Sequence, residues 1–393
     1  MKKHISTILL AIFFVLSAVA HYAGFNPVLQ FIFSAIAVVL VAGFLGRATE
    51  SVAHYAGQRL GGFLNATFGN AAELIIAIML LREGLYDMVK ASLTGSIIGN
   101  LLLVLGLSIF AGGLKHKVQN FNVALANMNG SLMIVAVIAL FVPALFLNTH
   151  SITHPQVNTL SLIVAGLLIL AYIAWLIFSM VTHKHYLADV KTTPAAVQTG
   201  GHGSGAAVAQ ISMDSATAAN AGTASPMTSS ATADVHEEEQ PDWSKKRSIL
   251  YLLIATVMTA FVSEWLVGTL ETFTSSFGFS ELFVGAFVVA IIGNAAEHSA
   301  AILLAMKNKI GASVEIAVGS SLQIALFVAP VLVFVSFFLG NTMDIVFTTL
   351  ELVAIMVSVF IAKSIIQDGS TNWYEGLLLI VVYIILGVSF YLV

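Results

Sequence analysis

The chain has 393 residues, of which 58% are hydrophobic and only 9% are charged, and its formal net charge is −4. Because soluble domains carry roughly 25% charged residues, this composition excludes a soluble globular protein. The chain contains no cysteine, which excludes disulfide bonds and thiol chemistry. The sequence contains no basic patch interleaved with aromatic residues, so nothing in it indicates nucleic-acid binding. Apolar runs of about 20 residues recur along most of the length, and they predict an all-α polytopic membrane protein.

The apolar runs predict eleven transmembrane helices. Lys2, Lys3 and the apolar run behind them, which ends at residues 18–20, fit either a cleaved signal peptide or a first span, and we favour the span. The predicted limits of the spans are 5–23, 28–46, 63–82, 90–113, 129–147, 160–181, 249–270, 280–305, 312–338, 344–362 and 375–393.

A segment of different composition separates the sixth and seventh spans. Residues 188–235 are rich in Ala, Thr, Ser and Gly and show no apolar periodicity, so they cannot bury a core and are predicted to form a flexible linker. The sequence HEEEQPDWSKKR (236–247) follows, with an acidic cluster ahead of a basic one. The expected parts are a first transmembrane helix (1–25), an N-terminal five-helix repeat (26–182), a cytoplasmic linker with an acidic segment (183–247) and a C-terminal five-helix repeat (248–393).

The basic residues predict the orientation of these spans. With the N-terminus in the cytoplasm, 14 of the 16 Lys and Arg residues fall on the cytoplasmic side, and only Arg82 and Lys90 do not. If one span were missed or added, every later loop would be assigned to the opposite side of the membrane, and the bias would be lost there. We therefore expect an integral membrane protein, in the plasma (inner) membrane if the chain is prokaryotic. Its N-terminus and long loop are expected in the cytoplasm and its C-terminus outside.

Two short motifs occur twice at one separation. GNAAE stands at 69–73 and at 293–297, 224 residues further on, and GSIIGN at 95–100 is followed by the related GSSLQI at 319–324 at the same separation. The chain therefore contains two homologous halves. Each half has five spans, an odd number, so the second half must enter the membrane from the opposite side. Inverted repeats of this kind are typical of transporters with a site near the bilayer midplane, and a duplicated membrane scaffold or enzyme is the alternative.

Glu73 and Glu297 occupy equivalent positions near the middle of their spans. A charged side chain at the bilayer centre costs about 2.5–3.5 kcal/mol on insertion scales, so it persists only with a partner. Because no Lys or Arg is predicted at comparable depth, a metal ion or a proton must supply the positive charge. The alternative is a protonated glutamate in a structural hydrogen bond, but its recurrence by inverted symmetry favours function.

Oxygen-bearing side chains accompany both glutamates at helical spacing, so each group is expected to share a helix face. Gly69 and Gly293 are expected to loosen the helix and to free backbone carbonyls. Hard oxygen ligands with two carboxylates suit Ca²⁺, whereas Zn²⁺ prefers His or Cys and Mg²⁺ usually keeps more of its waters. The predicted ion ligands are Glu73, Glu297, Asn70, Asn294, Ser96, Ser320, Asn100 and Gln323.

The charge of this predicted site suggests the coupling ion. Two carboxylates neutralise one Ca²⁺, and when the ion leaves, two bare carboxylates in a low-dielectric site favour proton uptake. Proton and Ca²⁺ binding at the same oxygens exclude each other, which is the requirement for exchange. Na⁺ coupling is the alternative, and it usually needs more ligand positions. In the second repeat, Ile324 stands at the position equivalent to Asn100, so one possible ligand is missing, and this favours protons as the coupling ion.

Further polar residues are candidates with open alternatives. His298 is a candidate for proton coupling, and a neutral hydrogen-bonded side chain is the equal alternative. Glu50 and Glu264, near the ends of the second and seventh spans, are candidates for an access path, against simple contact with interfacial water. A solvated loop is the alternative to a regulatory Ca²⁺ site formed by Glu237, Glu238, Glu239 and Asp242.

The repeated segments resemble the cation/proton exchanger branch of the Ca²⁺/cation antiporter superfamily. This resemblance implies an antiporter that exports cytosolic Ca²⁺ in exchange for H⁺, with Glu73 and Glu297 as shared carboxylates and the other predicted ligands around them. It also implies that the second and seventh spans slide to alternate access, that the acidic segment is regulatory, and that the chain forms a possible homo-oligomer. The carrying segments are LNATFGNAAELIIAI (64–78), GSIIGNLLLVLG (95–106), VVAIIGNAAEHSAA (288–301) and GSSLQIALFVAPVLV (319–333).

The rivals are a Na⁺-coupled Ca²⁺ exchanger and, from another class, a Ca²⁺ channel. A channel usually builds its filter from symmetric subunits, whereas this chain carries its own inverted pair. An intramembrane metalloenzyme is disfavoured because the sequence has no HExxH motif and His298 stands alone. We therefore expect no enzyme and no cofactor. The expected partners are the transported ions, Ca²⁺ and H⁺, and the lipid bilayer.

Overall fold

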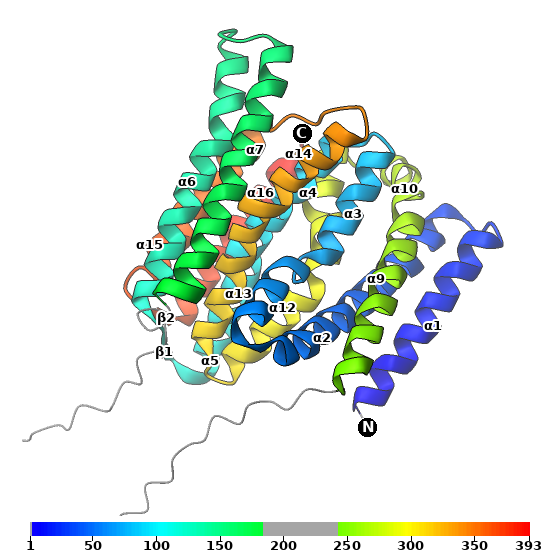
Figure 1. Cartoon of the computed structure of the whole chain (residues 1–393), viewed down its shortest axis with the longest axis horizontal. Coiled ribbons are helices and arrows are strands. Elements are labelled where there is room, and N and C mark those ends of the chain that lie inside the picture. The colour runs from blue at the N-terminus through cyan, green and yellow to red at the C-terminus, as the bar shows by residue number, and fades with distance from the viewer. Residues whose placement is uncertain (1, 184–242) are drawn as a thin grey trace, which may run out of the picture. The chain divides into compact units, whose positions relative to one another are not determined.

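The computed structural model describes residues 2–183 and 243–393 (Figure 1). Within these ranges the chain is helical except for two short strands and the connecting loops. Ten helices, or runs of consecutive helices, are long and apolar enough to cross a membrane. The predicted all-α, multi-span fold is therefore confirmed.

The first helix and the N-terminal repeat place their polar motifs where one helix gives way to the next. A π-helical turn, η1, interrupts the span that carries GSIIGN. The elements are α1 (Lys2–Tyr22), α2 (Pro27–Phe68), α3 (Ala71–Arg82), α4 (Tyr86–Ile98), η1 (Gly99–Val104), α5 (Leu105–His116), β1 (Val118–Asn120), α6 (Val123–Asn148), α7 (His154–Ile177) and η2 (Phe178–Thr182).

The C-terminal repeat contains the corresponding π-helical turn, η4, behind GSSLQ. Pro330 follows η4 and has no N–H to donate to the preceding turn, which accounts for irregular hydrogen bonding there. The elements are α9 (Lys245–Val267), α10 (Leu270–Phe277), α11 (Glu281–Phe283), η3 (Val284–Val289), α12 (Ala290–Met306), α13 (Ile310–Gln323), η4 (Ile324–Val328), α14 (Ala329–Phe338), α15 (Thr349–Ile366), β2 (Ser370–Asn372) and α16 (Trp373–Tyr391).

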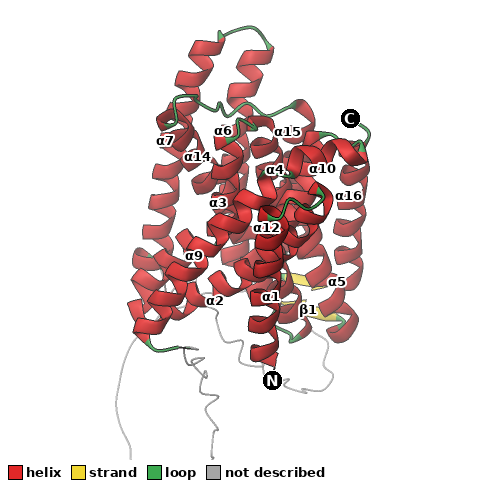
Figure 2. Cartoon of the chain, turned by 90° about the vertical axis from the view of Figure 1, so that its right-hand side faces the viewer, coloured by secondary structure: helices red, strands yellow, loops and turns green. Residues whose placement is uncertain are grey.

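The two strands mark one end of the helices. β1 and β2 pair antiparallel, with Gln119 opposite Thr371. Figure 2 shows this pair and the N-terminus toward one end, which we call the inner end, and the C-terminus toward the other, which we call the outer end. The run from α4 through η1 to α5 ends beside β1 and therefore descends from the outer to the inner end, as α12 also does (Figure 1). The helix α3 and the run from α13 to α14 rise in the opposite direction.

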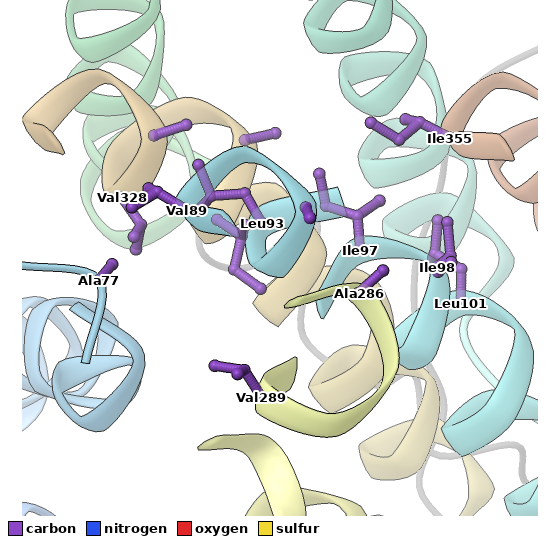
Figure 3. Packing of buried hydrophobic residues seen from close by; sticks show 14 of the residues in the cluster. Ala77, Val89, Leu93, Ile97, Ile98, Leu101, Ala286, Val289, Val328 and Ile355 are labelled. Atoms are coloured by element: carbon purple, nitrogen blue, oxygen red, sulfur yellow. The ribbon is translucent and has the colours of Figure 1, made fainter. Parts of the chain in front are cut away.

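The span of α4, η1 and α5 forms the centre of the core. Within an 18-residue apolar stretch of this span, 72% of the residues are buried, whereas only 17% are buried in the corresponding stretch of α1. Residues from α3, η3, η4 and α15 surround α4 (Figure 3). The central span therefore holds its polar motif rigidly between both repeats. The labelled core residues are Ala77, Val89, Leu93, Ile97, Ile98, Leu101, Ala286, Val289, Val328 and Ile355.

Two predicted spans differ from the observed elements. The predicted span 63–82 is interrupted, because α2 continues to Phe68 and a new helix starts at Ala71. Further back, α2 bends at Gly57, whose φ of 79° is readily available only to glycine. The predicted span 344–362 starts too early, since residues 341–348 are non-helical. The helix begins at Thr349 because Thr348 and Glu351 form a capping box there.

Candidate functional site

The first GNAAE motif starts a helix rather than lying within one. Asn70 occupies the N-cap position of α3 with non-helical backbone angles (φ −97°, ψ 25°), and Glu73 lies in the first turn. In the second copy, Asn294 and Glu297 lie inside the continuous helix α12. The expected loosening of the helix is therefore present around Gly69 but not around Gly293. Of the two asparagine–glutamate pairs, only Asn294 and Glu297 share the face of a continuous helix.

The two glutamates approach each other from opposite repeats. A Cβ added to Gly293 would lie 3.3 Å from Cγ of Glu73, so the Glu73 side chain packs on α12 at that glycine. Glu297 stands one turn further along the same face of α12. The two carboxyl groups are near enough to repel each other when both are charged. The predicted pairing of the repeat carboxylates is thus present in the geometry.

The side chain of Asn294 is oriented by two hydrogen bonds. Its amide nitrogen donates to Oγ of Ser96 (3.0 Å) and to the carbonyl of Ala290 (2.9 Å). Because the nitrogen is engaged twice, the amide oxygen is left for another partner. Among the described residues nothing donates to that oxygen, although Asn294 is fully buried. An oxygen in this position is suited to binding a cation.

The side chain of Asn70 is engaged at both ends. Its oxygen accepts from Oγ of Ser320 (3.0 Å), and its nitrogen donates to Oε1 of Gln323. The carboxyl group of Glu297 also lies within hydrogen-bonding reach of the Ser320 hydroxyl. Asn70 of the first repeat is therefore tied to the second repeat, as Asn294 of the second is tied to the first. The partners are the serines of the GS motifs in both cases.

His298 contacts the opposite repeat as well. Its Nε2 lies 3.2 Å from Oδ1 of Asn100, which belongs to η1. The amide nitrogen of Asn100 has no hydrogen-bond partner among the described residues, and Asn100 is buried. The contact is consistent with both interpretations of His298, so its part in proton coupling stays a prediction.

The eight predicted ligands come together at the contact of α3, α4 with η1, α12 and α13. Each forms or approaches a contact with another member of the set or, for Asn100, with His298 next to Glu297. Three buried acceptor oxygens in this cluster lack a donor among the residues that the structure describes: Glu73 Oε2, Glu297 Oε2 and Asn294 Oδ1. Buried oxygens are almost always satisfied in proteins, so this group calls for a positive charge.

The other predicted polar residues lie elsewhere. Glu50 and Glu264 are exposed on α2 and α9. Glu264 continues an exposed stripe of α9 that includes Leu253, Val257 and Phe261. The place of Glu50 and Glu264 on an access path stays a prediction. The acidic residues Glu237, Glu238, Glu239 and Asp242 lie outside the described residues.

Sequence reasoning missed a second, partly buried polar cluster near the outer end. Lys90 pairs with Asp87 (3.1 Å) and Asp344 (3.4 Å), and Thr94, one turn along α4, donates to the buried Glu351 (3.4 Å). These contacts fasten α4 to the segment before α15 and to α15 itself. The sequence does contain a signal for this cluster, because Lys90 is one of only two basic residues that the predicted topology does not place on the cytoplasmic side.

Comparison with known proteins agrees with this architecture. The family described as "Sodium/calcium exchanger protein" matches residues 26–181 and 247–392. The Ca²⁺/H⁺ antiporter ChaA of Bacillus subtilis is 44% identical over 358 residues, which cover 91% of this chain and 90% of that protein. A Ca²⁺/H⁺ antiporter of Synechocystis is 43% identical over 389 residues, which cover 98% and 96% of the two chains.

Solved structures resemble the fold over nearly the whole chain. The structure of native YfkE is 38% identical, superposes with a TM-score of 0.77, and covers 99% of this chain and 100% of its own. The H⁺/Ca²⁺ exchanger CAX, at 11% identity and a TM-score of 0.64, shares the fold over 100% of this chain and 93% of that chain. The chain therefore belongs to the sodium/calcium exchanger protein family and, within it, to the cation/proton exchanger branch.

Proposed function

We propose that this protein is a secondary active antiporter that exchanges Ca²⁺ for H⁺ across a membrane. The observation that carries the proposal is a group of three oxygens from both repeats that have no hydrogen-bond partner in the part of the chain that the structure describes: Glu73 Oε2, Glu297 Oε2 and Asn294 Oδ1. The names of the relatives, which are Ca²⁺/H⁺ antiporters at 43–44% identity over most of the chain, support the choice of ions.

The chemistry of the ligands supports Ca²⁺ as the metal ion. The cluster offers carboxylate, amide and hydroxyl oxygens, which are the hard ligands that Ca²⁺ binds six to eight at a time. Within the described residues, no group of three His, Cys, Asp or Glu side chains is placed to hold a metal ion. That argues against a resident transition-metal site and for a transported ion held partly by neutral oxygens.

Exchange follows from competition for the same carboxylates. With Ca²⁺ bound, Glu73 and Glu297 are both ionised and their charges are balanced by the ion. When Ca²⁺ leaves, the repulsion between the two carboxylates and their burial favour protonation of both. Each state excludes the other, so one site carries Ca²⁺ one way and protons the other. The Ser320 hydroxyl lies beside Glu297 and has one proton, which it donates either to Asn70 or to the ionised carboxylate.

The pair of helices α2 and α9 is the proposed moving part for alternating access. At their inner ends the two helices are joined by a hydrogen bond between Ser51 and Ser248 (2.8 Å) and by contact of the Phe44 and Tyr251 rings. On its other face α2 crosses α12 closely, because a Cβ added to Gly43 would lie 3.7 Å from Cβ of Ala296. Ala296 immediately precedes Glu297, so a shift of α2 against α12 would change access to the carboxylate.

The proposed orientation places the N-terminus and the linker in the cytoplasm and the C-terminus outside. It rests on the bias of basic residues toward one side of the predicted spans. With this orientation the inner end is cytoplasmic, and the antiporter exports cytosolic Ca²⁺. The membrane is the plasma (inner) membrane for a prokaryotic chain.

The experiment is ⁴⁵Ca²⁺ uptake into proteoliposomes, driven by an imposed pH gradient or by an imposed Na⁺ gradient. Wild type is compared with Glu297→Gln, and Glu271→Gln in α10 serves as a matched glutamate outside the cluster. We expect uptake on the pH gradient alone, lost in Glu297→Gln and retained in Glu271→Gln. Uptake only on the Na⁺ gradient would assign sodium coupling, and Ca²⁺ flux that needs neither gradient would indicate a channel.

A further inference from the structure

The two repeats differ in chemistry at one pair of equivalent positions beside the carboxylates. The separation of 224 residues that relates GNAAE at 69 to GNAAE at 293 also relates Leu74 to His298 and Asn100 to Ile324. One pair is polar and joins the repeats through the 3.2 Å contact of His298 Nε2 with Asn100 Oδ1. The equivalent pair, Leu74 and Ile324, is entirely apolar.

The backbone around Asn100 and Ile324 is alike in both repeats. Asn100 lies in η1 and Ile324 opens η4, so a π-helical turn follows the polar motif in each half. Ile324 is fully buried in the main hydrophobic core, and Leu74 packs against the same core. Gln323, directly before Ile324, is bonded to Asn70, which places the start of η4 at the site. At Asn100 and Ile324 the side chains, not the local folds, therefore set the two repeats apart.

The direction of the helices places the two pairs on opposite sides of the carboxylates. Because α12 and the run from α4 to α5 descend to the inner end, His298 and Asn100 lie on the inner side of Glu297 and Ser96 (Figure 1). Because α3 and the run from α13 to α14 rise, Leu74 and Ile324 lie on the outer side of Glu73 and Ser320. Asn100 and Ile324 each lie four residues, about 6 Å along the axis, beyond Ser96 and Ser320, whereas His298 and Leu74 are each offset from their glutamate by one residue, about 1.5 Å.

We propose that Leu74 and Ile324 form an apolar barrier on the outer side of the carboxylates, and that the polar lining of His298 and Asn100 exists on the inner side only. The proposal rests on the proposed ion-exchange function of the site. An apolar constriction resists hydrated ions and protons because they would have to give up their water there. The inner side differs, since the unpartnered amide nitrogen of the buried Asn100 requires a water or ligand oxygen.

The barrier has a defined role in an exchanger. Exchange is tight only if protons cannot pass the carboxylates while no Ca²⁺ is moving. A continuous polar lining from the inner to the outer side would allow such a leak, and an apolar segment on one side is enough to stop it. Leu74 and Ile324 are thus assigned as residues that preserve coupling, without contributing a ligand to the ion.

The test replaces Ile324 on the outer side by asparagine, the residue found at the equivalent position 100 on the inner side. Ile324→Asn is reconstituted into liposomes with an imposed pH gradient and no Ca²⁺, and the decay of the gradient is followed with an entrapped pH-sensitive dye. We expect the proton leak to rise about tenfold over wild type, since an amide in place of an alkyl group lowers the penalty for water at that point. Ile324→Leu, which keeps an apolar side chain of the same size, is the control and is expected to leak like wild type.

A parallel assay of Ca²⁺ uptake by the wild-type protein on pH and Na⁺ gradients distinguishes failure of the proposed function from failure of the barrier proposal. Absence of exchange in the wild type overturns the proposed function, whatever the leak. Normal wild-type exchange with equal leak in Ile324→Asn and Ile324→Leu overturns the barrier alone. The reciprocal variant Asn100→Ile removes polarity from the inner side, and it is expected to slow Ca²⁺ uptake from that side without raising the leak.

A second measurement is available if Ile324→Asn does not fold. The natural chain has no cysteine, so single-cysteine variants carry one reactive thiol. Ile324→Cys and Asn100→Cys are treated with a membrane-impermeant thiol reagent from each side. We expect reaction of Asn100→Cys from the inner side during turnover and no reaction of Ile324→Cys from the outer side. Ready reaction of Ile324→Cys from the outer side would show that the barrier does not exist.

Discussion

The two copies of GNAAE have the same five letters and different structures. In the first copy the helix breaks before Asn70, whose oxygen and nitrogen both bond to the second repeat. In the second copy the helix continues through Asn294, whose nitrogen is bonded twice and whose oxygen is free. A duplicated motif therefore does not build a symmetric site. It supplies like groups, which the two surroundings then use in different ways.

The difference arises from what each copy follows in the chain. The first copy follows α2, which bends at Gly57 and ends at Phe68, so a fresh helix must start at the motif. The second copy follows η3, which passes into α12 without a break. The first glutamate accordingly lies at a helix N-terminus and the second lies well inside a helix. Ion binding must accommodate this asymmetry.

Replacing either glutamate tests what the copies have in common, and we expect the largest effect there. Glu73→Gln and Glu297→Gln each remove one of the two charges that balance Ca²⁺. Loss of a buried charge interaction is worth about 3–5 kcal/mol, so Ca²⁺ uptake on a pH gradient should fall by roughly 100-fold or more in both. The measurement is initial ⁴⁵Ca²⁺ uptake with the amount of folded protein held equal.

Glu271→Gln, in the outer helix α10, is the matched control and should transport at the wild-type rate. Substantial uptake in one of the two cluster variants would show that a single carboxylate suffices. The pairing of the repeats would then not be the basis of exchange.

The sequence predicts the shared parts of the molecule and not the parts that differ. Apolar runs, basic residues and the recurring motifs indicate the spans and the ligands that the structure brings together, because these features depend on composition and spacing. The break before Asn70 is expected from the sequence only as a loosening at Gly69, and the π-helical turns are not predicted, because neither feature follows from apolar runs or from motif spacing. The pairing of Lys90 with Asp344 joins segments more than 200 residues apart in the chain, for which a single sequence carries no local signal.

The paired glycines of the GS motifs give a second test, on stability. A Cβ on Gly95 would collide with the backbone of Ala286, whereas one on its counterpart Gly319 would meet nothing within 4 Å. We expect Gly95→Ala to lower the free energy of unfolding by about 3 kcal/mol, because neither backbone can yield. Thermal unfolding in detergent measures this change.

Gly319→Ala is the control, expected to be neutral or to stabilise α13 by up to about 1 kcal/mol through helix propensity. Equal losses in both variants would contradict the difference in packing between the repeats.

The two asparagines sharpen the comparison at the site. Asn294→Ala removes an oxygen that is free to bind the ion, whereas Asn70→Ala removes one that already accepts from Ser320. We expect the KM for Ca²⁺ to rise about tenfold in Asn294→Ala, and about fivefold in Asn70→Ala, which loses hydrogen bonds of about 1 kcal/mol rather than a free ligand. Initial rates over a range of Ca²⁺ concentrations measure both. Equal increases would mean that Asn70 exchanges its partners for the ion on binding.

The serines bonded to these asparagines are expected to show the smallest effect. Ser96 contacts Asn294 alone, and its loss leaves the Asn294 nitrogen bonded to the carbonyl of Ala290. Ser320 holds Asn70 and also lies beside the Glu297 carboxyl, so its hydroxyl serves two members of the site. A hydrogen bond at the lower end of the range of about 0.5–1.5 kcal/mol corresponds to about twofold, so Ser96→Ala should raise the KM for Ca²⁺ about twofold, and Ser320→Ala by more than Ser96→Ala but less than Asn70→Ala.

Threonine variants at the two positions separate the hydroxyl from the loss of volume. Ser96→Thr and Ser320→Thr keep the hydroxyl and should restore Ca²⁺ affinity where the hydroxyl is what matters. If Ser96→Ala proves more harmful than Ser320→Ala, the orientation of Asn294 by Ser96 matters more than the stabilisation of Glu297. The second repeat would then supply the ion's neutral ligand, and the first repeat would serve chiefly to hold that ligand in place.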